Sequence, residues 1–176
     1  MVNPDLFQKA LDFAALAHQG QKTAGGQPYV LHPVKVFFEA LAVFHSSKEL
    51  NLDLLITAAL LHDTIEDTKA GYEKVKEVFG KETADGVLAL SKNEKLPKEE
   101  RMRDSLERIK KQPKEIWIVK MADRIINLGI PPFHWDKAKK TEYQKEAFLI
   151  YETLKEADSE IAQRLFQKIK EYEIYF

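Results

Sequence analysis

The sequence is constrained most by an apolar run at residues 54–61, which leads directly into four ionisable residues: His62, Asp63, Glu66 and Asp67. If this stretch is helical, side chains four residues apart lie about 40° apart around the axis. His62 then lies over Glu66, and Asp63 lies over Asp67. Removing such charges from water without compensation costs several kcal/mol. A divalent cation supplies the compensation, because imidazole and carboxylate groups are its natural ligands. The stretch therefore predicts an apolar helix that ends in a metal site.

The rest of the chain has the apolar spacing of helices, and Asn3-Pro4 is typical of a helix start. The predicted helices cover residues 4–19, 34–44, 52–65, 71–79, 83–90, 97–110, 113–128, 137–157 and 159–172. We find no alternating strand pattern between hairpin turns and no internal repeat. A chain of 176 residues is long enough to bury a core in one domain. We therefore expect an all-α helical bundle that forms a single domain over residues 1–176.

The composition limits the partners of the protein. A formal net charge of −1 leaves no surplus of either sign, which argues against nucleic acids and membrane surfaces as partners. The absence of cysteine excludes a disulfide framework, a thiolate zinc site and a cysteine nucleophile. The first residues lack the pattern of a signal peptide, and no apolar run reaches the roughly 20 residues of a membrane span. We therefore expect a cytoplasmic protein.

Two other histidines lie near helix ends. His32 precedes Pro33, which is predicted to open the helix at 34–44 and to leave His32 at its N-cap. A histidine in such a rigid turn is either structural or a metal ligand. His18 lies on the first predicted helix, where it is either a packing residue or part of a pocket.

The predicted helix at 113–128 is apolar on almost all sides, with Asp123, Arg124 and Asn127 as exceptions. A carboxylate among apolar residues needs a partner. Arg124 is adjacent in sequence and therefore points to another side of the helix. Metal binding by Asp123, with Asn127 one turn further along, solves this burial problem, and we take it as one of the open alternatives.

Taken together, His32, His62, Asp63 and Asp123 form a set of two imidazoles and two carboxylates on three predicted helices. A mixed nitrogen and oxygen set suits a first-row divalent ion such as manganese or iron. Zinc is an alternative, although catalytic zinc more often has three protein ligands. Magnesium and calcium prefer ligand sets made only of oxygen.

In several separated motifs, from about residue 17 to 127, the sequence resembles the HD-domain hydrolases, and among them the small alarmone hydrolases. These are stand-alone relatives of the hydrolase domain of the stringent-response synthetase/hydrolase enzymes. The matching motifs are Ala17-His18-Gln19-Gly20-Gln21, Pro28-Tyr29-Val30-Leu31-His32-Pro33, Ala58 to Thr68, Phe79-Gly80, Leu96-Pro97-Lys98 with Glu100-Arg101, and Lys120 to Arg124 with Asn127-Leu128.

The resemblance implies manganese-dependent removal of the 3′-pyrophosphate from guanosine 3′,5′-polyphosphate alarmones (ppGpp and pppGpp), which leaves GDP or GTP. It also implies a role for each matching residue. His32, His62, Asp63 and Asp123 match the metal ligands; Glu66 and Asp67 match the acidic pair that acts on the attacking water; Asn127 and Lys98 match residues near the ribose and the phosphates. Of the acidic pair, we expect Glu66 to take the proton and Asp67 to orient the water.

One departure concerns the base. Where the family has Arg-Lys-Ser-Gly before Pro-Tyr, this chain has Thr23, Ala24, Gly25 and Gly26, with Lys22 one position earlier. We expect Lys22 and Thr23 to contact the substrate. Loss of the arginine removes a stacking and hydrogen-bonding group, so an adenosine 3′,5′-polyphosphate (ppApp) is an alternative substrate. Two other readings stay open: an HD phosphatase that acts on another nucleotide such as NADPH, and a nucleotide sensor without turnover.

Overall fold

The computed structural model describes residues 3–41 and 49–176. Its helices in chain order are α1 (Pro4–Ala17), α2 (Leu31–Leu41), α3 (Leu52–Leu61), α4 (Thr64–Asp67), α5 (Tyr72–Phe79), α6 (Lys81–Leu90), α7 (Lys98–Ile109), α8 (Lys114–Asn127), α9 (Lys137–Leu154) and α10 (Ser159–Glu171), followed by a 3₁₀ turn (Tyr172–Tyr175). The described residues contain no strand, only an isolated bridge between Lys22 and Pro28. The all-α prediction is confirmed. Within these ranges, no helix combines the length and the apolar character that a membrane crossing requires.

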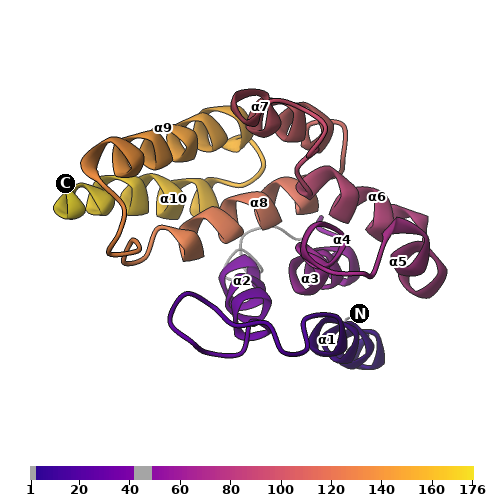
Figure 1. Ribbon diagram of the computed structural model, residues 1–176. Helices are drawn as coiled ribbons and strands as arrows, with labels where there is room; N and C mark the ends of the chain where they lie inside the picture. The colour runs from indigo at the N-terminus through magenta and orange to yellow at the C-terminus, as the bar shows by residue number, and fades with distance from the viewer. Residues whose placement is uncertain (1–2, 42–48) are drawn as a thin grey trace.

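Helix α8 lies at the centre of the molecule, between the pair α9 and α10 on one side and α2 and α3 on the other (Figure 1). A helix that is buried on nearly all sides must carry apolar residues around its whole circumference. From Glu115 to Ile125 the only residue of α8 that is not fully buried is Trp117. Asp123 is therefore held in place by packing on every other side of its helix.

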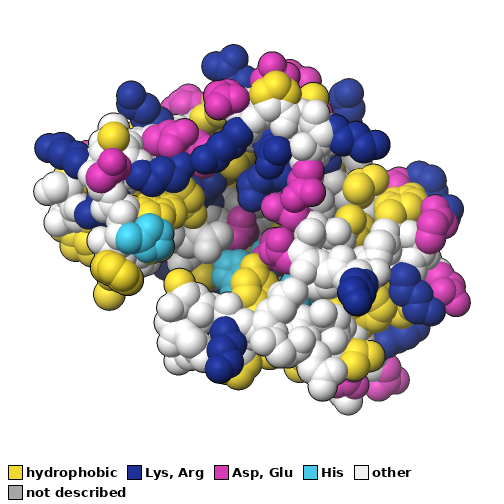
Figure 2. Space-filling model, viewed as in Figure 1, with side chains coloured by type: hydrophobic (Ala, Val, Ile, Leu, Met, Phe, Trp, Pro, Cys, Tyr) yellow, Lys and Arg dark blue, Asp and Glu magenta, His cyan; other side chains and the backbone are white. Residues whose placement is uncertain are grey.

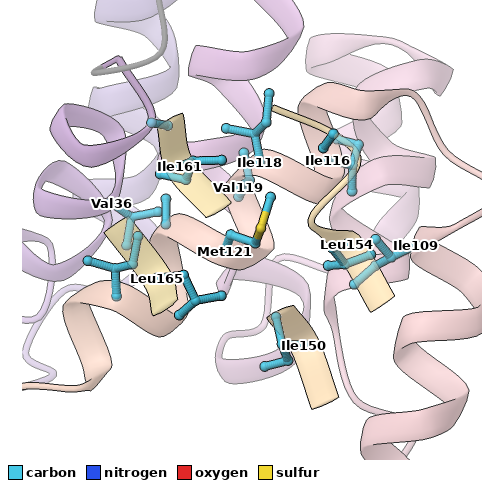
Figure 3. Close-up of a cluster of buried hydrophobic side chains, with 14 of the residues drawn as sticks. Val36, Ile109, Ile116, Ile118, Val119, Met121, Ile150, Leu154, Ile161 and Leu165 are labelled. Atoms are coloured by element: carbon cyan, nitrogen blue, oxygen red, sulfur yellow. The ribbon is translucent and has the colours of Figure 1, made fainter. Parts of the chain in front are cut away.

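The main core surrounds α8 (Figure 3). Val36 of α2, Leu154 of α9 and Leu165 of α10 are fully buried in the same cluster as Ile118 and Met121 of α8. Burial of side chains of this size contributes roughly 1.5–3 kcal/mol each. This core fixes the positions of α2 and α8, which carry two of the predicted metal ligands.

Helix α3 joins this core to a second apolar cluster formed with α1, α5 and α6. All eight residues at 54–61 are buried, as the sequence predicted. The prediction of one continuous helix over 52–65 is wrong, because α3 ends at Leu61 and a separate turn of helix, α4, begins at Thr64. The side chain of His62 donates a hydrogen bond to the Ala59 carbonyl at 2.8 Å, and that of Thr64 donates one to the Leu61 carbonyl at 2.7 Å. Carbonyls satisfied in this way no longer need the backbone N–H groups of a continued helix.

Helix α2 begins earlier than predicted. Leu31 is its first residue, so His32 lies within the first turn and not at the N-cap. The turn at Pro28 and Tyr29 already has helix-like hydrogen bonds, since the N–H of His32 donates to the Tyr29 carbonyl at 2.8 Å. Pro33 fits there because the first helical turn makes no use of its missing N–H. The predicted end of this helix, at 42–44, falls outside the described residues.

Candidate metal centre and its pocket

Three of the four predicted ligands form a compact cluster. Ligand atoms of His32, His62 and Asp123 all lie within 4.8 Å of one another. The Nε2 atoms of His32 and His62 are 3.3 Å apart, and Asp123 Oδ1 lies 3.3 Å from the first and 3.7 Å from the second. Asp63 Oδ2 completes the group at 3.0 Å from His62 Nε2 and 3.5 Å from His32 Nε2.

His62 is oriented by the end of α3. Its Nδ1 lies 2.8 Å from the Ala59 carbonyl, which can only accept, so Nδ1 carries a proton and Nε2 faces the other cluster members. The imidazole is almost fully buried. Burial disfavours its charged form, yet Asp63 and Asp123 outweigh that effect and hold the pKa of His62 well above 6.5. The surroundings of His62 therefore favour a positive charge at its Nε2, carried either by a proton or by a cation bound in its place.

Asp123 has two partners on its own helix. Asn127 Nδ2 donates to Oδ1 at 2.6 Å, and the buried Lys120 ammonium lies 3.3 Å from Oδ2. Burial alone raises the pKa of Asp123, but the charge of Lys120 and hydrogen bonds from His32 and His62 hold it well below 3.8. Arg124 points away, as predicted, and lies over the Tyr143 ring at 4.2 Å. Asp123 is thus an ionised carboxylate directed at the two imidazoles.

Asp63 is held by Tyr29, whose hydroxyl donates to Oδ2 at 2.7 Å and lies 3.4 Å from Asp67 Oδ2. Burial opposes ionisation of Asp63. The charge of His62 and the hydrogen bonds from His62 and Tyr29 nevertheless lower its pKa to about 2. Asp63 therefore contributes a second ionised carboxylate to the cluster.

The cluster fits a divalent cation. Metal bonds to histidine nitrogen and carboxylate oxygen are about 2.0–2.2 Å long, so neighbouring ligand atoms lie about 3.0–3.5 Å apart. Four of the five distances among the imidazole nitrogens and the carboxylate oxygens, 3.0–3.5 Å, fall within that spacing, and the fifth is 3.7 Å. Two ionised carboxylates and two imidazoles also supply the charge and the donor types that such an ion requires.

The acidic pair of α4 lies beside the cluster. Both carboxylate oxygens of Glu66 are bound by Lys92, one by the backbone N–H at 2.7 Å and one by the ammonium at 3.1 Å. Asp67 has no cation at such a distance among the described residues. Partial burial and the negative charges of Asp63 and Glu66 raise the pKa of Asp67 above 3.8.

All of these groups open into one pocket of about 750 Å³. Figure 2 shows histidine side chains at the bottom of a hollow, with acidic side chains beside them and lysines and arginines along its edge. Of the predicted substrate contacts, Thr23 and Asn127 line this pocket, whereas Lys22 and Lys98 do not. Lys98 lies in a separate groove between α7 and α9, together with Glu142 and Lys145.

Several residues of the pocket were not predicted as site residues: Tyr29, Lys92, Lys120 and Trp135. Lys92 belongs to a polar segment after α6 and carries no local pattern that separates it from the neighbouring lysines. Lys120 was detectable, because a lysine on a helix that is apolar on almost all sides faces the same burial problem as Asp123.

The chain is similar to known proteins in sequence and in structure. A family model described as the HD domain matches residues 10–159. The guanosine-3′,5′-bis(diphosphate) 3′-pyrophosphohydrolase MESH1 of Danio rerio is 32% identical over 165 residues, which cover 90% of this chain and 89% of that protein. The bifunctional (p)ppGpp synthase/hydrolase SpoT of Escherichia coli (strain K12) is 36% identical over 118 residues, 64% of this chain and 16% of SpoT. A solved structure described as a metazoan ortholog of SpoT that hydrolyzes ppGpp has a TM-score of 0.82 and 26% identity, with 97% of both chains covered.

Proposed function

The chain belongs to the HD domain family, and on that premise we propose that it hydrolyses the 3′-pyrophosphate of guanosine 3′,5′-polyphosphates, with residues 1–176 forming one metal-dependent phosphohydrolase domain. The names of MESH1 and SpoT support this substrate class. The observation that carries the proposal is the cluster of His32, His62 and Asp123, with Asp63 Oδ2 3.5 Å from His32 Nε2 and with Glu66 and Asp67 in the same pocket.

Manganese is the proposed cation, held by His32, His62, Asp63 and Asp123. The mixed nitrogen and oxygen donors favour manganese or iron over magnesium and calcium. When bound, such an ion polarises phosphate oxygens and lowers the pKa of a coordinated water. The Tyr29 hydroxyl and the Asn127 amide each donate to a carboxylate of this set, at 2.7 and 2.6 Å, and so keep it aimed at the ion.

Hydrolysis forms a bond between the oxygen of water and the phosphorus on the ribose 3′-oxygen, and it breaks the bond from that phosphorus to the 3′-oxygen. One proton leaves the water, and one is gained by the departing ribose oxygen. Glu66 is the proposed acceptor of the water proton, and Asp67 is the proposed partner that orients the water.

The pocket is large enough for such a nucleotide, but its lining gives no reason to expect strict selection of guanine. Its volume, about 750 Å³, lies within the range of nucleotide-sized sites. The loop that lines it with Thr23, Ala24 and Gly25 offers small side chains and no arginine. We therefore propose that adenosine 3′,5′-polyphosphates are also accepted.

The test is an assay of the purified protein with manganese against guanosine and adenosine 3′,5′-bisdiphosphates, with product analysis. Release of pyrophosphate and a nucleoside 5′-diphosphate is expected, and an Asp123→Asn variant measured in parallel should be inactive. GDP, which has a free 3′-hydroxyl and no 3′-phosphate, serves as the negative control. Release of orthophosphate from these nucleotides or from NADPH would favour the phosphatase reading, and tight binding without turnover would favour a sensor.

A further inference from the structure

We propose that Lys92 binds a phosphate group of the substrate and that this contact releases the Glu66 carboxylate, with which Lys92 pairs in the free protein. The inference rests on the proposed function, since it assigns a polyphosphate to the pocket. According to this inference, Glu66, the proposed proton acceptor, loses its ion pair with Lys92 only when a substrate is bound.

The free protein holds Glu66 with both functional groups of Lys92. The backbone N–H of Lys92 donates to Oε2 at 2.7 Å, and the ammonium donates to Oε1 at 3.1 Å. The two residues come from α4 and from the segment directly after α6, 26 positions apart. A carboxylate oxygen that already accepts a hydrogen bond from an ammonium has one fewer lone pair with which to accept one from water. In this arrangement Glu66 is therefore restrained until the ammonium moves.

The side chain of Lys92 has open space around it. The side chain of Lys92 is 46% exposed, whereas that of Glu66 is 19% exposed. Lys92 lines both the main pocket and a neighbouring hollow that contains Asn93 and Lys95. Side-chain rotation alone can thus carry its ammonium from Glu66 to an anion in the pocket, while the backbone N–H stays where it is.

The other lysines of the pocket lining differ from Lys92 in this respect. Lys120 is buried and lies 3.3 Å from Asp123 Oδ2, so its charge is already used by the cluster. Lys35 lines the pocket on α2 and contacts neither Glu66 nor Asp67 in the described structure. A polyphosphate adds several negative charges to a pocket that already holds Asp63, Asp67 and Asp123. It attracts an ammonium more strongly than a single carboxylate does, because a phosphate group carries more charge and more acceptor oxygens.

A binding experiment isolates this exchange from turnover. The probe is inorganic pyrophosphate, titrated calorimetrically at one fixed manganese concentration into the wild type, Lys92→Met, Lys92→Arg, Glu66→Gln and the double variant. Lys95→Met is the matched control, because Lys95 lies three positions away and outside the main pocket. We expect Lys92→Met to weaken binding about tenfold, as for loss of a charge-assisted contact. Lys92→Arg should restore most of it, and Lys95→Met should match the wild type.

The release of Glu66 is tested by the pyrophosphate affinity of the Glu66→Gln variants. Glu66→Gln should bind pyrophosphate about two- to fivefold more tightly than the wild type, which is the range for a half-exposed ion pair that no longer has to break. In the Lys92→Met background the same change should give a clearly smaller gain, since no pair exists there. Equal gains in both backgrounds, or wild-type binding by Lys92→Met, would overturn the inference. The variants could show this binding pattern while the wild type releases no pyrophosphate from either alarmone. That result would reject the proposed function and not the inference.

Discussion

Replacement of Tyr29 by phenylalanine tests the proposed metal centre through a residue that is not one of the proposed ligands. The hydroxyl of Tyr29 donates to Asp63 Oδ2 at 2.7 Å, and this oxygen is also the one that lies 3.0 Å from His62 Nε2. Burial and the nearby Asp63 carboxylate keep the pKa of Tyr29 far above 10. The hydroxyl is therefore protonated at any working pH and always available as a donor.

The magnitude follows from the type of hydrogen bond. A hydrogen bond to a charged group contributes about 1.5–3 kcal/mol, and each 1.4 kcal/mol is a factor of ten. Tyr29 is only partly buried, so water replaces part of the lost contact, and we expect a result near the lower limit. The predicted loss is about tenfold in manganese affinity, within the range known for hydrogen bonds that support metal ligands. The ring itself remains, packed against His18 with centroids 4.8 Å apart, so the fold should be unchanged.

The assay is a calorimetric titration of manganese into metal-free protein, followed by turnover at saturating manganese. Tyr72→Phe is the control, because its hydroxyl also donates to an aspartate, Asp85, at 2.7 Å, but outside the pocket. Thermal unfolding of both variants checks that each is folded. Equal manganese affinity in Tyr29→Phe and the wild type would refute the assignment of Asp63 as a ligand held by Tyr29.

Three further predictions concern the cluster and the acidic pair. Asp63→Ala should lose manganese and activity together, whereas Glu66→Ala should keep manganese and lose turnover; equal metal loss by elemental analysis would contradict these roles. Removal of the metal with a chelator should abolish pyrophosphate release, and added manganese should restore it; activity that survives complete removal would reject a metal-dependent reaction. Asp67→Asn should stabilise the metal-free protein at neutral pH by less than about 1 kcal/mol, because the pKa of Asp67 is raised in the folded state and its charged form is disfavoured there. Well below pH 3.8 the carboxyl is protonated in both the folded and the unfolded state, so denaturant titration should show no such gain there.

The all-α fold and the burial of Asp123 beside the histidines were accessible from the sequence, because each depends on a local pattern with a burial cost. The apolar run at 54–61 had to be covered, and it is buried throughout. Asp123 required a partner among apolar neighbours, and it lies 3.3 Å from the His32 imidazole. In both cases the energetic penalty of the alternative is several kcal/mol, which leaves few solutions.

The details that the sequence did not predict depend on contacts between segments that are distant in the chain. The break at His62 arises because two side chains replace backbone donors at the end of α3, which helical periodicity cannot indicate. Lys92 reaches Glu66 across 26 positions, and only the packing of α4 on α6 brings them together. Lys98 shows the reverse case: its motif matches the family, yet in this structure its side chain lies in the groove between α7 and α9.

The geometry of the centre is a property of the core more than of the ligands themselves. The cluster gathers two carboxylates whose mutual repulsion favours separation, so the ligands alone do not hold it together. The chain holds them because α2, α3 and α8 contact one another in pairs and share the main apolar cluster. A metal site tolerates errors of only about 0.5 Å in its ligands. Buried side chains such as Val36 and Met121, which lie in this core on the same helices as His32 and Asp123, therefore help to fix the positions of these two residues.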